Sequence, residues 1–274
     1  MLRVNIVGIG PGNPDLLTGA ARKAVEEANI LIGDKRMLAG FNQTNKKVYT
    51  TIKTKEIAEI AEAADEEKDV IAILVSGDVG FFSLAKTIQG KLPNCDCKRF
   101  AGISSLVYFA SQIEMSWDDA KIVSMHGREQ NLIHAVATNK KVFSLTGGDN
   151  SAHALCRRLT DHGLGDVLVY VGENLSYPEE KITKAKACEI AELTFPSLSV
   201  MMIINEKAKA FEPRVHGLAD DLFLRTKVPM TKQEVRAVSM SKLQPKATDY
   251  IYDIGAGTGS CSIELALLAN QGHV

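Results

Sequence analysis

The chain has 274 residues, 45% of them hydrophobic, and its 32 basic and 33 acidic residues leave a formal net charge of -1. This length allows two domains, or one domain of two lobes, each with its own core. The balanced charge argues against binding to nucleic acid or to an anionic membrane surface through overall electrostatic attraction.

The sequence carries no sign of a membrane span or of secretion. No apolar stretch approaches the roughly 20 residues that cross a bilayer, and the first residues lack the pattern of a signal peptide. The five cysteines are odd in number and scattered, which suits reduced thiols. Cys95 and Cys97 have no second pair or histidine at metal-ligand spacing. We therefore expect a cytoplasmic protein without a metal site.

Aliphatic runs alternate with amphipathic stretches in the first part of the chain, which predicts an α/β fold. The run from Val70 to Ser76 shows no polar alternation, as strands of a mostly parallel sheet covered on both faces require. Thr18 is a suitable N-cap for the first helix. The runs in question cover residues 4–9, 20–28, 30–32, 57–64, 70–75 and 82–88.

A second α/β set follows Trp117, and we place a hinge at about 112–119. This predicts two lobes, at about 1–115 and 116–207. Strands are expected at 121–124, 141–145, 167–171, 182–187 and 198–204, and helices at 132–138 and 152–159.

The character of the chain changes after Asn205. We expect a connector over 208–230, then a helix that begins with a capping box at Thr231 and Glu234. Residues 248–269 resemble the strand, glycine loop and helix that open a nucleotide-cofactor domain. Residues 231–274 are therefore expected to be its truncated start, either disordered or packed on another surface, because its apolar faces lack neighbours.

Three loops rich in small residues follow candidate strands: GIGPG at 8–12, SGDVGFFS at 76–83 and AGISS at 101–105. Ligands of open α/β sheets collect at the carboxyl ends of strands, so we expect the loops to converge on one site. Pro11 and the late start of the first helix argue against a dinucleotide fingerprint. Asp78 suits either an amino or hydroxyl group of a ligand or an Asx-turn, and both interpretations stay open.

These loops, followed in order by SMHGR, LTGGDN and GENLSYPEEKI, resemble the tetrapyrrole (corrin and porphyrin) methylase family over about residues 1–207. The HGR and GENLSYPEEKI segments are most similar to its precorrin-6Y methyltransferase branch. VPMTKQEVRAVSMSKL and DIGAGTGS resemble the start of the class I methyltransferase domain that, in this family, methylates carbon 15 and decarboxylates an acetate side chain. Asp253, Gly255, Gly257 and Gly259 match the glycine-loop motif of that domain.

The resemblance implies a two-lobed methylase fold, S-adenosylmethionine as cofactor and a homodimer. It further implies methylation of carbon 5 of precorrin-6B or its cobalt form in cobalamin biosynthesis. An electron-rich ring carbon attacks the methyl group, so the protein chiefly aligns the reactants. The residues implied to contact the cofactor are Pro11, Ser76, Gly77, Asp78, Phe81, Ser104, Ser105, Thr146 and Leu175.

Four further residues are candidates for the substrate and the chemistry. Arg128, with Arg36 behind it, suits the carboxylates of a corrin ring; an exposed surface charge is the alternative for each and the favoured interpretation for Arg36. His126 could relay the proton released on methylation, and a structural histidine is an equal alternative. Glu173 could orient the cofactor or the substrate.

Three alternatives stay open. The chain could be a methylase of the same fold with a different acceptor, because a fold does not define a substrate. It could be a non-catalytic module that binds the cofactor, with the C-terminal segment docking to a separate carbon-15 methyltransferase domain. The glycine loops alone would also allow a nicotinamide-dependent oxidoreductase.

Overall fold

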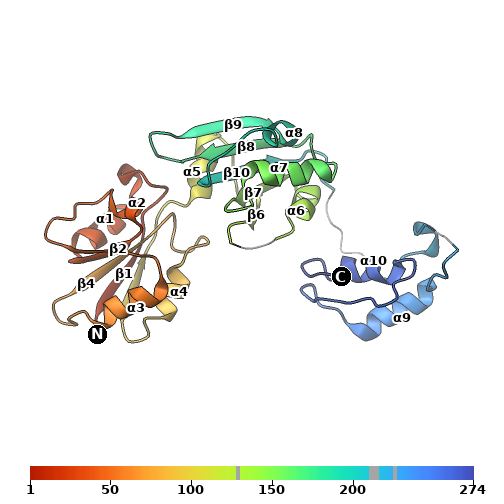
Figure 1. Ribbon diagram of the computed structural model, residues 1–274, viewed down its shortest axis with the longest axis horizontal. Coiled ribbons are helices and arrows are strands. Elements are labelled where there is room, and N and C mark those ends of the chain that lie inside the picture. The colour runs from red at the N-terminus through yellow and green to blue at the C-terminus, as the bar shows by residue number, and fades with distance from the viewer. Residues whose placement is uncertain (128–129, 210–215, 225–226) are drawn as a thin grey trace.

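The computed structural model describes residues 1–127, 130–209, 216–224 and 227–274. The first lobe is built on a five-stranded sheet in the order β3-β2-β4-β1-β5, and all of its strand pairs are parallel (Figure 1). The parallel α/β prediction is thus confirmed for this lobe. The strands are β1 (Arg3–Gly8), β2 (Ile30–Gly33), β3 (Lys47–Thr50), β4 (Val70–Val75) and β5 (Asp96–Phe100).

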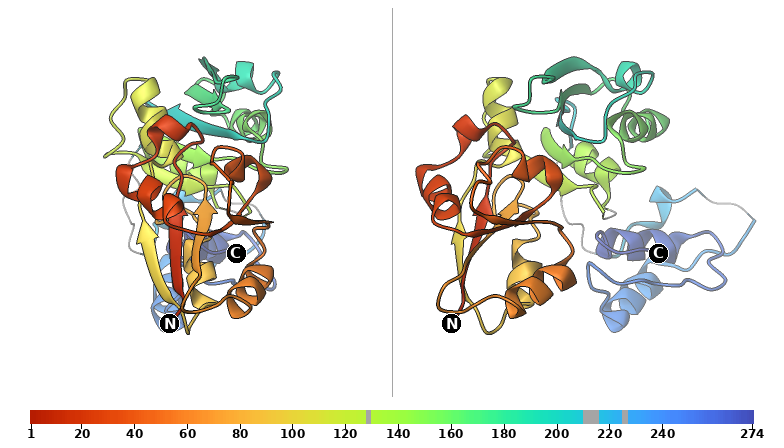
Figure 2. Two further views of the ribbon diagram at one scale, coloured as in Figure 1. Left: turned by 90° about the vertical axis from the view of Figure 1, so that its left-hand side faces the viewer. Right: turned by 60° about the vertical axis from the view of Figure 1, so that its left-hand side comes forward.

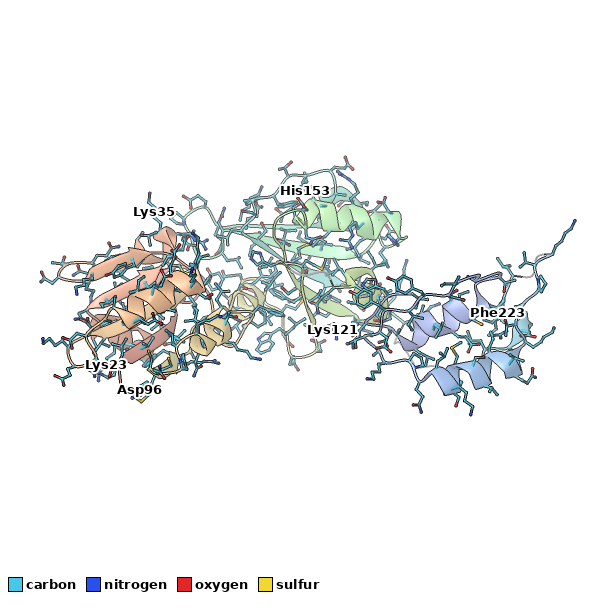
Figure 3. All side chains as sticks on the ribbon, turned by 60° about the horizontal axis from the view of Figure 1, so that its bottom comes forward. Lys23, Lys35, Asp96, Lys121, His153 and Phe223 are labelled. Carbon is cyan, nitrogen blue, oxygen red and sulfur yellow. The ribbon has the colours of Figure 1, made fainter. Side chains whose placement is uncertain are left out.

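Helices cover both faces of the first sheet. Alternate residues of β4 point to opposite faces, so Ile73 packs under α3 and α4 while Leu74 packs under α1 and α2. Thr18 caps α1 by accepting a hydrogen bond from the Ala21 backbone N–H, as predicted. The charged ends of Lys23 and Lys35 lie on the outer surface of the lobe (Figure 3). The helices are α1 (Gly19–Glu26), α2 (Lys35–Leu38), α3 (Thr54–Glu62) and α4 (Ala85–Gly90), with a short 3-10 turn at Pro14–Leu16.

The second lobe contains a mixed sheet in the order β6-β7-β10-β8-β9. Only β6 and β7 pair in parallel, because β10 enters between β7 and β8 in the opposite direction and β8 and β9 are antiparallel neighbours. The second sheet therefore differs from the first, in which all strand pairs are parallel. Its strands are β6 (Lys121–Ser124), β7 (Lys141–Leu145), β8 (Leu168–Glu173), β9 (Lys181–Lys186) and β10 (Ser199–Ile204).

Helix α5 (Ser105–Gln112) links the two lobes (Figure 2). It follows β5 of the first sheet, yet its buried Leu106 and Phe109 pack with Phe143 and Met202 on one face of the second sheet. The opposite face of that sheet is covered by α6 (Leu132–Thr138), α7 (Ala152–Asp161) and α8 (Ala187–Ile190).

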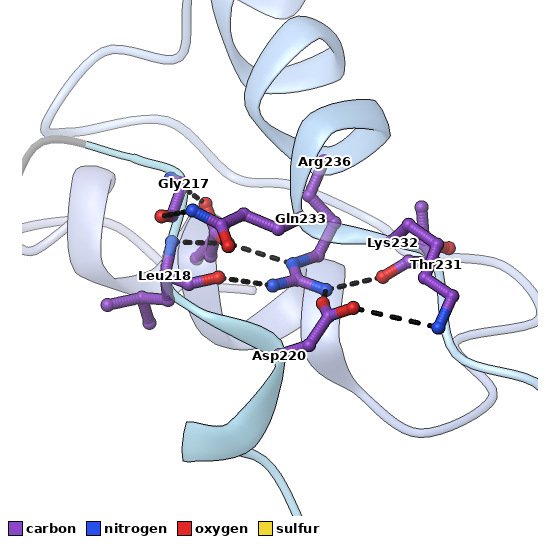
Figure 4. A network of polar contacts seen from close by, with 8 residues as sticks. Gly217, Leu218, Asp220, Thr231, Lys232, Gln233 and Arg236 are labelled. Atoms are coloured by element: carbon purple, nitrogen blue, oxygen red, sulfur yellow. Dashed lines mark hydrogen bonds and ion pairs between the residues drawn. The ribbon is translucent and has the colours of Figure 1, made fainter.

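The C-terminal part forms a small unit around a buried arginine. Arg236 of α9 is fully buried and donates to Oε1 of Glu264 at 2.9 Å and to Oδ1 of Asp220 at 2.8 Å (Figure 4). Glu264 of α10 also accepts from the backbone N–H groups of Gly217 and Leu218. Such pairing offsets the cost of removing both charges from water. The helices are α9 (Gln233–Leu243) and α10 (Ser260–Leu268), and a 3-10 turn spans Asp220–Leu222.

Two sequence predictions for this unit are wrong. The N-cap residue of α9 is Lys232 and not Thr231, and its side chain makes no cap hydrogen bond. The expected strand before the glycine loop is reduced to one bridge between Tyr250 and His273, and Ile254 is 96% exposed. A strand needs neighbours to pair with, and the described residues of this unit provide only this one bridge.

Within the described ranges, no helix combines the length and apolar character needed to cross a membrane. The same residues contain no group of three or more histidine, cysteine or acidic side chains able to hold a metal ion. All five cysteines are free.

The contact of α5 with the second sheet generates a stability prediction. A Cβ atom at Gly172 of β8 would lie 2.7 Å from Cε2 of Phe109, so Gly172→Ala should lower the free energy of unfolding by about 1 to 3 kcal/mol. Gly90→Ala is the matched control, because the space around Gly90 is open, and it should change that energy by less than about 1 kcal/mol. Urea denaturation measures both, and equal effects would contradict this account of the packing.

Candidate active site

Three loops of the first lobe meet because β1 lies between β4 and β5. Gly10 donates its N–H to the Gly77 carbonyl at 3.1 Å, and Gly77 donates to the Gly10 carbonyl at 2.8 Å. A Cβ atom at Gly102 would lie 2.2 Å from the Gly77 oxygen, and one at Gly8 would lie 2.7 Å from it. Only glycine allows this approach. The predicted convergence of the loops is confirmed.

The Asp78 carboxylate joins two of these loops. Its Oδ1 accepts from the Gly80 N–H at 2.8 Å, which is an Asx-turn, and its Oδ2 accepts from the Gly102 N–H at 3.1 Å. Both carboxylate oxygens therefore hold backbone in place. This arrangement favours the structural interpretation of Asp78, and it makes the residue a brace of the loops.

Ser104 caps α5 at the third loop, where its Oγ accepts from the Val107 N–H at 3.2 Å. A Cβ atom at Gly77 would lie 3.8 Å from Ser104 Cα, so the cap stands beside the second loop. Phe81 extends from that second loop to the other lobe, and its ring centroid lies 6.1 Å from that of Phe143 in β7.

The carboxyl ends of β6, β7 and β8 share one edge of the second sheet and bring the remaining candidates together. His126 Nδ1 lies 3.2 Å from the Thr146 carbonyl oxygen. Because a carbonyl only accepts, Nδ1 carries the hydrogen, and Nε2 of the neutral ring keeps a free lone pair. Thr146 donates its own hydroxyl to the Ser199 carbonyl at 2.7 Å.

Glu173 ends β8 at the same edge, and one of its carboxylate oxygens lacks a hydrogen-bond partner among the described residues. The residue is only 8% exposed, and its Oε2 is buried without a hydrogen-bond partner among the described residues. Buried polar atoms are normally paired, so this oxygen suits a cationic ligand. Leu175, two residues later, is buried against Phe109 and Val200.

The two lobes contact each other at this site. The Asn13 N–H donates to Ser176 Oγ at 2.9 Å, and the Tyr177 ring lies so close to Gly12 that a Cβ atom there would be 2.3 Å from Tyr177 Cζ. The GENLSYPEEKI segment contains Ser176 and Tyr177, but the sequence alone indicated no role for either residue. The contact joins residues 163 positions apart, which spacing along the chain cannot reveal.

A cavity of about 140 Å³ adjoins the loop after β4 at Ser76. Three of its apolar lining side chains, Ile52, Phe82 and Leu84, remain nearly half exposed. Sequence reasoning missed this hollow, because its lining comes from β4, from α2, α3 and α4 and from the loops after β3 and β4. The lining residues are Met37, Thr51, Ile52, Ile57, Ile73, Leu74, Val75, Ser76, Phe82, Ser83, Leu84 and Ile88.

The two arginine candidates differ in what the structure says of them. Arg128 lies outside the described residues. The Arg36 guanidinium lies 5.4 Å from the centroid of the Tyr177 ring, a cation–π contact, and it forms no ion pair with any described residue.

The chain is similar to known proteins in both sequence and fold. Residues 3–191 match the model of the tetrapyrrole (corrin/porphyrin) methylases, and residues 221–274 match that of the precorrin methyltransferase domain. The fold is similar to the crystal structure of uroporphyrin-III C-methyltransferase from Thermus thermophilus complexed with S-adenosylhomocysteine. The TM-score is 0.59 at 22% identity, over 73% of this chain and 91% of that one. This likeness shows the fold alone.

Two curated relatives extend the comparison. The chain is 35% identical over 204 residues to a probable cobalt-precorrin-7 C(5)-methyltransferase of Methanocaldococcus jannaschii, across 72% of this chain and 95% of that protein. It is 27% identical over 269 residues to a decarboxylating precorrin-6Y C(5,15)-methyltransferase of a Sinorhizobium species, across 96% of this chain but 64% of that protein. The extent of the family match and the identity to the archaeal relative establish that the chain belongs to the tetrapyrrole (corrin/porphyrin) methylases.

Proposed function

We propose that this chain is a methyltransferase of corrin-ring biosynthesis that transfers the methyl group of S-adenosylmethionine to carbon 5 of a precorrin intermediate. One observation carries the proposal. The loops after β1, β4 and β5 converge and contact the carboxyl-end edge of the second sheet through Asn13 and Ser176. The names of the two curated relatives, a C(5)- and a C(5,15)-methyltransferase, support the acceptor position.

The residues at the converging loops fit a cationic methyl donor. Gly10, Gly77 and Gly102 keep side chains out of the loops, so a ligand can approach the backbone closely. The buried Glu173 Oε2 offers an anionic oxygen without a partner among the described residues. When bound, S-adenosylmethionine supplies a methyl group on a positively charged sulfur. The residues assigned to holding it are Pro11, Ser76, Gly77, Asp78, Phe81, Ser104, Ser105, Thr146 and Leu175.

The acceptor is assigned to the apolar hollow at Ser76. Ile52, Phe82 and Leu84 present apolar surface that a flat macrocycle would cover, and the hollow adjoins the loop that holds the donor. Arg128 and the unpaired Arg36 are assigned to the carboxylates of the macrocycle. Alignment of ring and donor at this site would supply most of the rate enhancement.

His126 is assigned to the proton that leaves the ring after methylation. Its Nδ1–H donates to the Thr146 carbonyl, so Nε2 is the atom that accepts a proton, through its lone pair. Glu173 is assigned to orient the cofactor or the substrate at the same edge.

Residues 231–274 are assigned to the start of a carbon-15 methyltransferase domain, after a connector at 208–230. The match of residues 221–274 to the precorrin methyltransferase domain supports this assignment. Gly255, Gly257 and Gly259 all have positive φ, as a cofactor loop of this kind requires. Five free cysteines support a reducing compartment, the cytoplasm, and the family resemblance supports a homodimer.

A methylase with a different acceptor and a non-catalytic cofactor-binding module are the alternatives. Calorimetric titration should give binding of S-adenosylhomocysteine and none of NAD. Labelled S-adenosylmethionine should then methylate precorrin-6B, its cobalt form or cobalt-precorrin-7, with the new methyl group at carbon 5 by NMR. Binding of S-adenosylhomocysteine without methyl transfer to any of these acceptors would favour the binding module. Binding of NAD alone would overturn the proposal.

Asp78→Asn should weaken the donor site. The amide keeps one acceptor and loses the charge, so one of the bonds to Gly80 or Gly102 is lost. At about 1.5 to 3 kcal/mol for a hydrogen bond to a charged group, the dissociation constant for S-adenosylhomocysteine should rise at least about tenfold. Asp96→Asn, in exposed β5, is the control and should leave the affinity unchanged. Equal affinity in both variants would remove Asp78 from the site.

His126→Gln should lower kcat by about 100-fold while leaving the affinity for S-adenosylhomocysteine within about twofold of the original. The matched control is His162→Gln, because His162 is exposed and also bonds a backbone carbonyl through Nδ1, at 2.8 Å, on α7. That control should retain full activity. Full activity of the His126 variant would assign the residue a structural role only.

A further inference from the structure

The loop between β8 and β9, residues 174–180, extends from the second sheet onto the glycine loop of the first lobe. The Ser176 hydroxyl accepts a hydrogen bond from the Asn13 N–H, and the Tyr177 ring covers Gly12. Both contacts fall directly after Pro11, which is assigned to the methyl donor. The loop therefore covers one side of the proposed donor site.

The backbone of this loop is held in an unfavourable conformation. Ser176 has φ of 68° and Asn174 has φ of 46°, in the left-handed region that a serine rarely occupies. Such residues persist only when the surrounding structure holds them in place, and they cluster at functional sites. Some other group must therefore fix Ser176.

That group is Glu180. Its Oε2 accepts both the backbone N–H of Ser176 and the hydroxyl of Tyr108, the latter at 2.8 Å. Burial, reinforced by the bond to Glu180, raises the pKa of Tyr108 to about 12, so the hydroxyl remains a donor at neutral pH. Tyr108 belongs to α5, which begins at the Ser104 cap of the donor site. One carboxylate oxygen thus joins the β8–β9 loop to α5.

We propose that Glu180 is a positioning residue of the methyl-donor site, which holds Ser176 so that the β8–β9 loop closes over the glycine loop at Gly12 and Asn13. Glu180 itself touches neither reactant. The proposal rests on the proposed function, because it takes the converging loops to be the site of S-adenosylmethionine. It adds a residue outside the set assigned to cofactor or substrate.

A positioning role and a purely structural role differ in what a substitution changes. If Glu180 has a purely structural role, its substitution lowers the unfolding temperature. Ligand affinity measured well below that temperature then stays unchanged. If Glu180 has a positioning role, its substitution lowers the affinity for S-adenosylhomocysteine. It also releases the Asn13 amide, whose hydrogen bond to Ser176 depends on the loop. Amide hydrogen exchange at Asn13 measures this release without any ligand.

The test compares Glu180→Ala, Glu180→Gln and two controls in the full chain. Glu180→Ala should raise the dissociation constant for S-adenosylhomocysteine at least tenfold and speed exchange at Asn13. Glu180→Gln keeps a neutral acceptor, so its effects should be intermediate. Glu179→Ala, an exposed neighbour without a hydrogen bond or ion pair among the described residues, should change neither quantity. Ile190→Val, at a buried residue of α8, should lower the unfolding temperature alone.

Tyr108→Phe provides an independent arm. It removes one of the two bonds to Glu180, so its effects on affinity and exchange should not add to those of Glu180→Ala. Original affinity and slow Asn13 exchange in Glu180→Ala would overturn the proposal, as would an affinity loss that Ile190→Val reproduces. If Glu180→Ala does not fold, the Gln and Tyr108 variants decide by the same two measurements. If the unchanged protein does not bind S-adenosylhomocysteine, the proposed function fails, and Asn13 exchange still decides whether Glu180 holds the loop.

Discussion

The backbone contact among Gly8, Gly77 and Gly102 is the constraint on which the candidate site depends. β1 lies between β4 and β5, so the loops that follow β4 and β5 each start one strand spacing from the loop after β1. They can approach further only because each contact residue lacks a Cβ atom. The Asp78 carboxylate then accepts the Gly80 N–H within its own loop and fixes this second loop to the third through the Gly102 N–H. The result is a rigid rim of main chain at the carboxyl edge of a parallel sheet, where ligands of such sheets bind.

Helix α5 transmits the geometry of this rim to the second lobe. Its N-terminus is capped by Ser104 beside Gly77, while its Phe109 packs against the second sheet at the space left by Gly172. A shift of the helix would therefore move both halves of the site together. The aromatic contact between Phe81 and Phe143 adds a second connection of the same kind. The contact between the lobes at this site is thus defined by packing and not by the linker alone.

The C-terminal unit follows a different principle. It is held by Arg236, which pairs with Asp220 and Glu264 and is further packed on the Phe223 ring. This network fixes the segment before α9 to α10 without a sheet. Apolar side chains of the segment expected to form a strand, such as Ile254, stay exposed instead. The residue pattern of a strand was present, but pairing partners decide whether a strand forms.

Local patterns by themselves determined the α/β class, the Thr18 cap, the strand of residues 70–75 and the loops that carry the candidate site, because periodicity and small residues report the immediate surroundings of the backbone. Family resemblance added the fold and the expected chemistry. Only the tertiary structure decided that the second sheet is mixed, that Asp78 braces two loops and that Glu180 meets Tyr108 and Ser176. These features join residues far apart in the chain, and their pairing depends on which strands become neighbours, which no local pattern encodes.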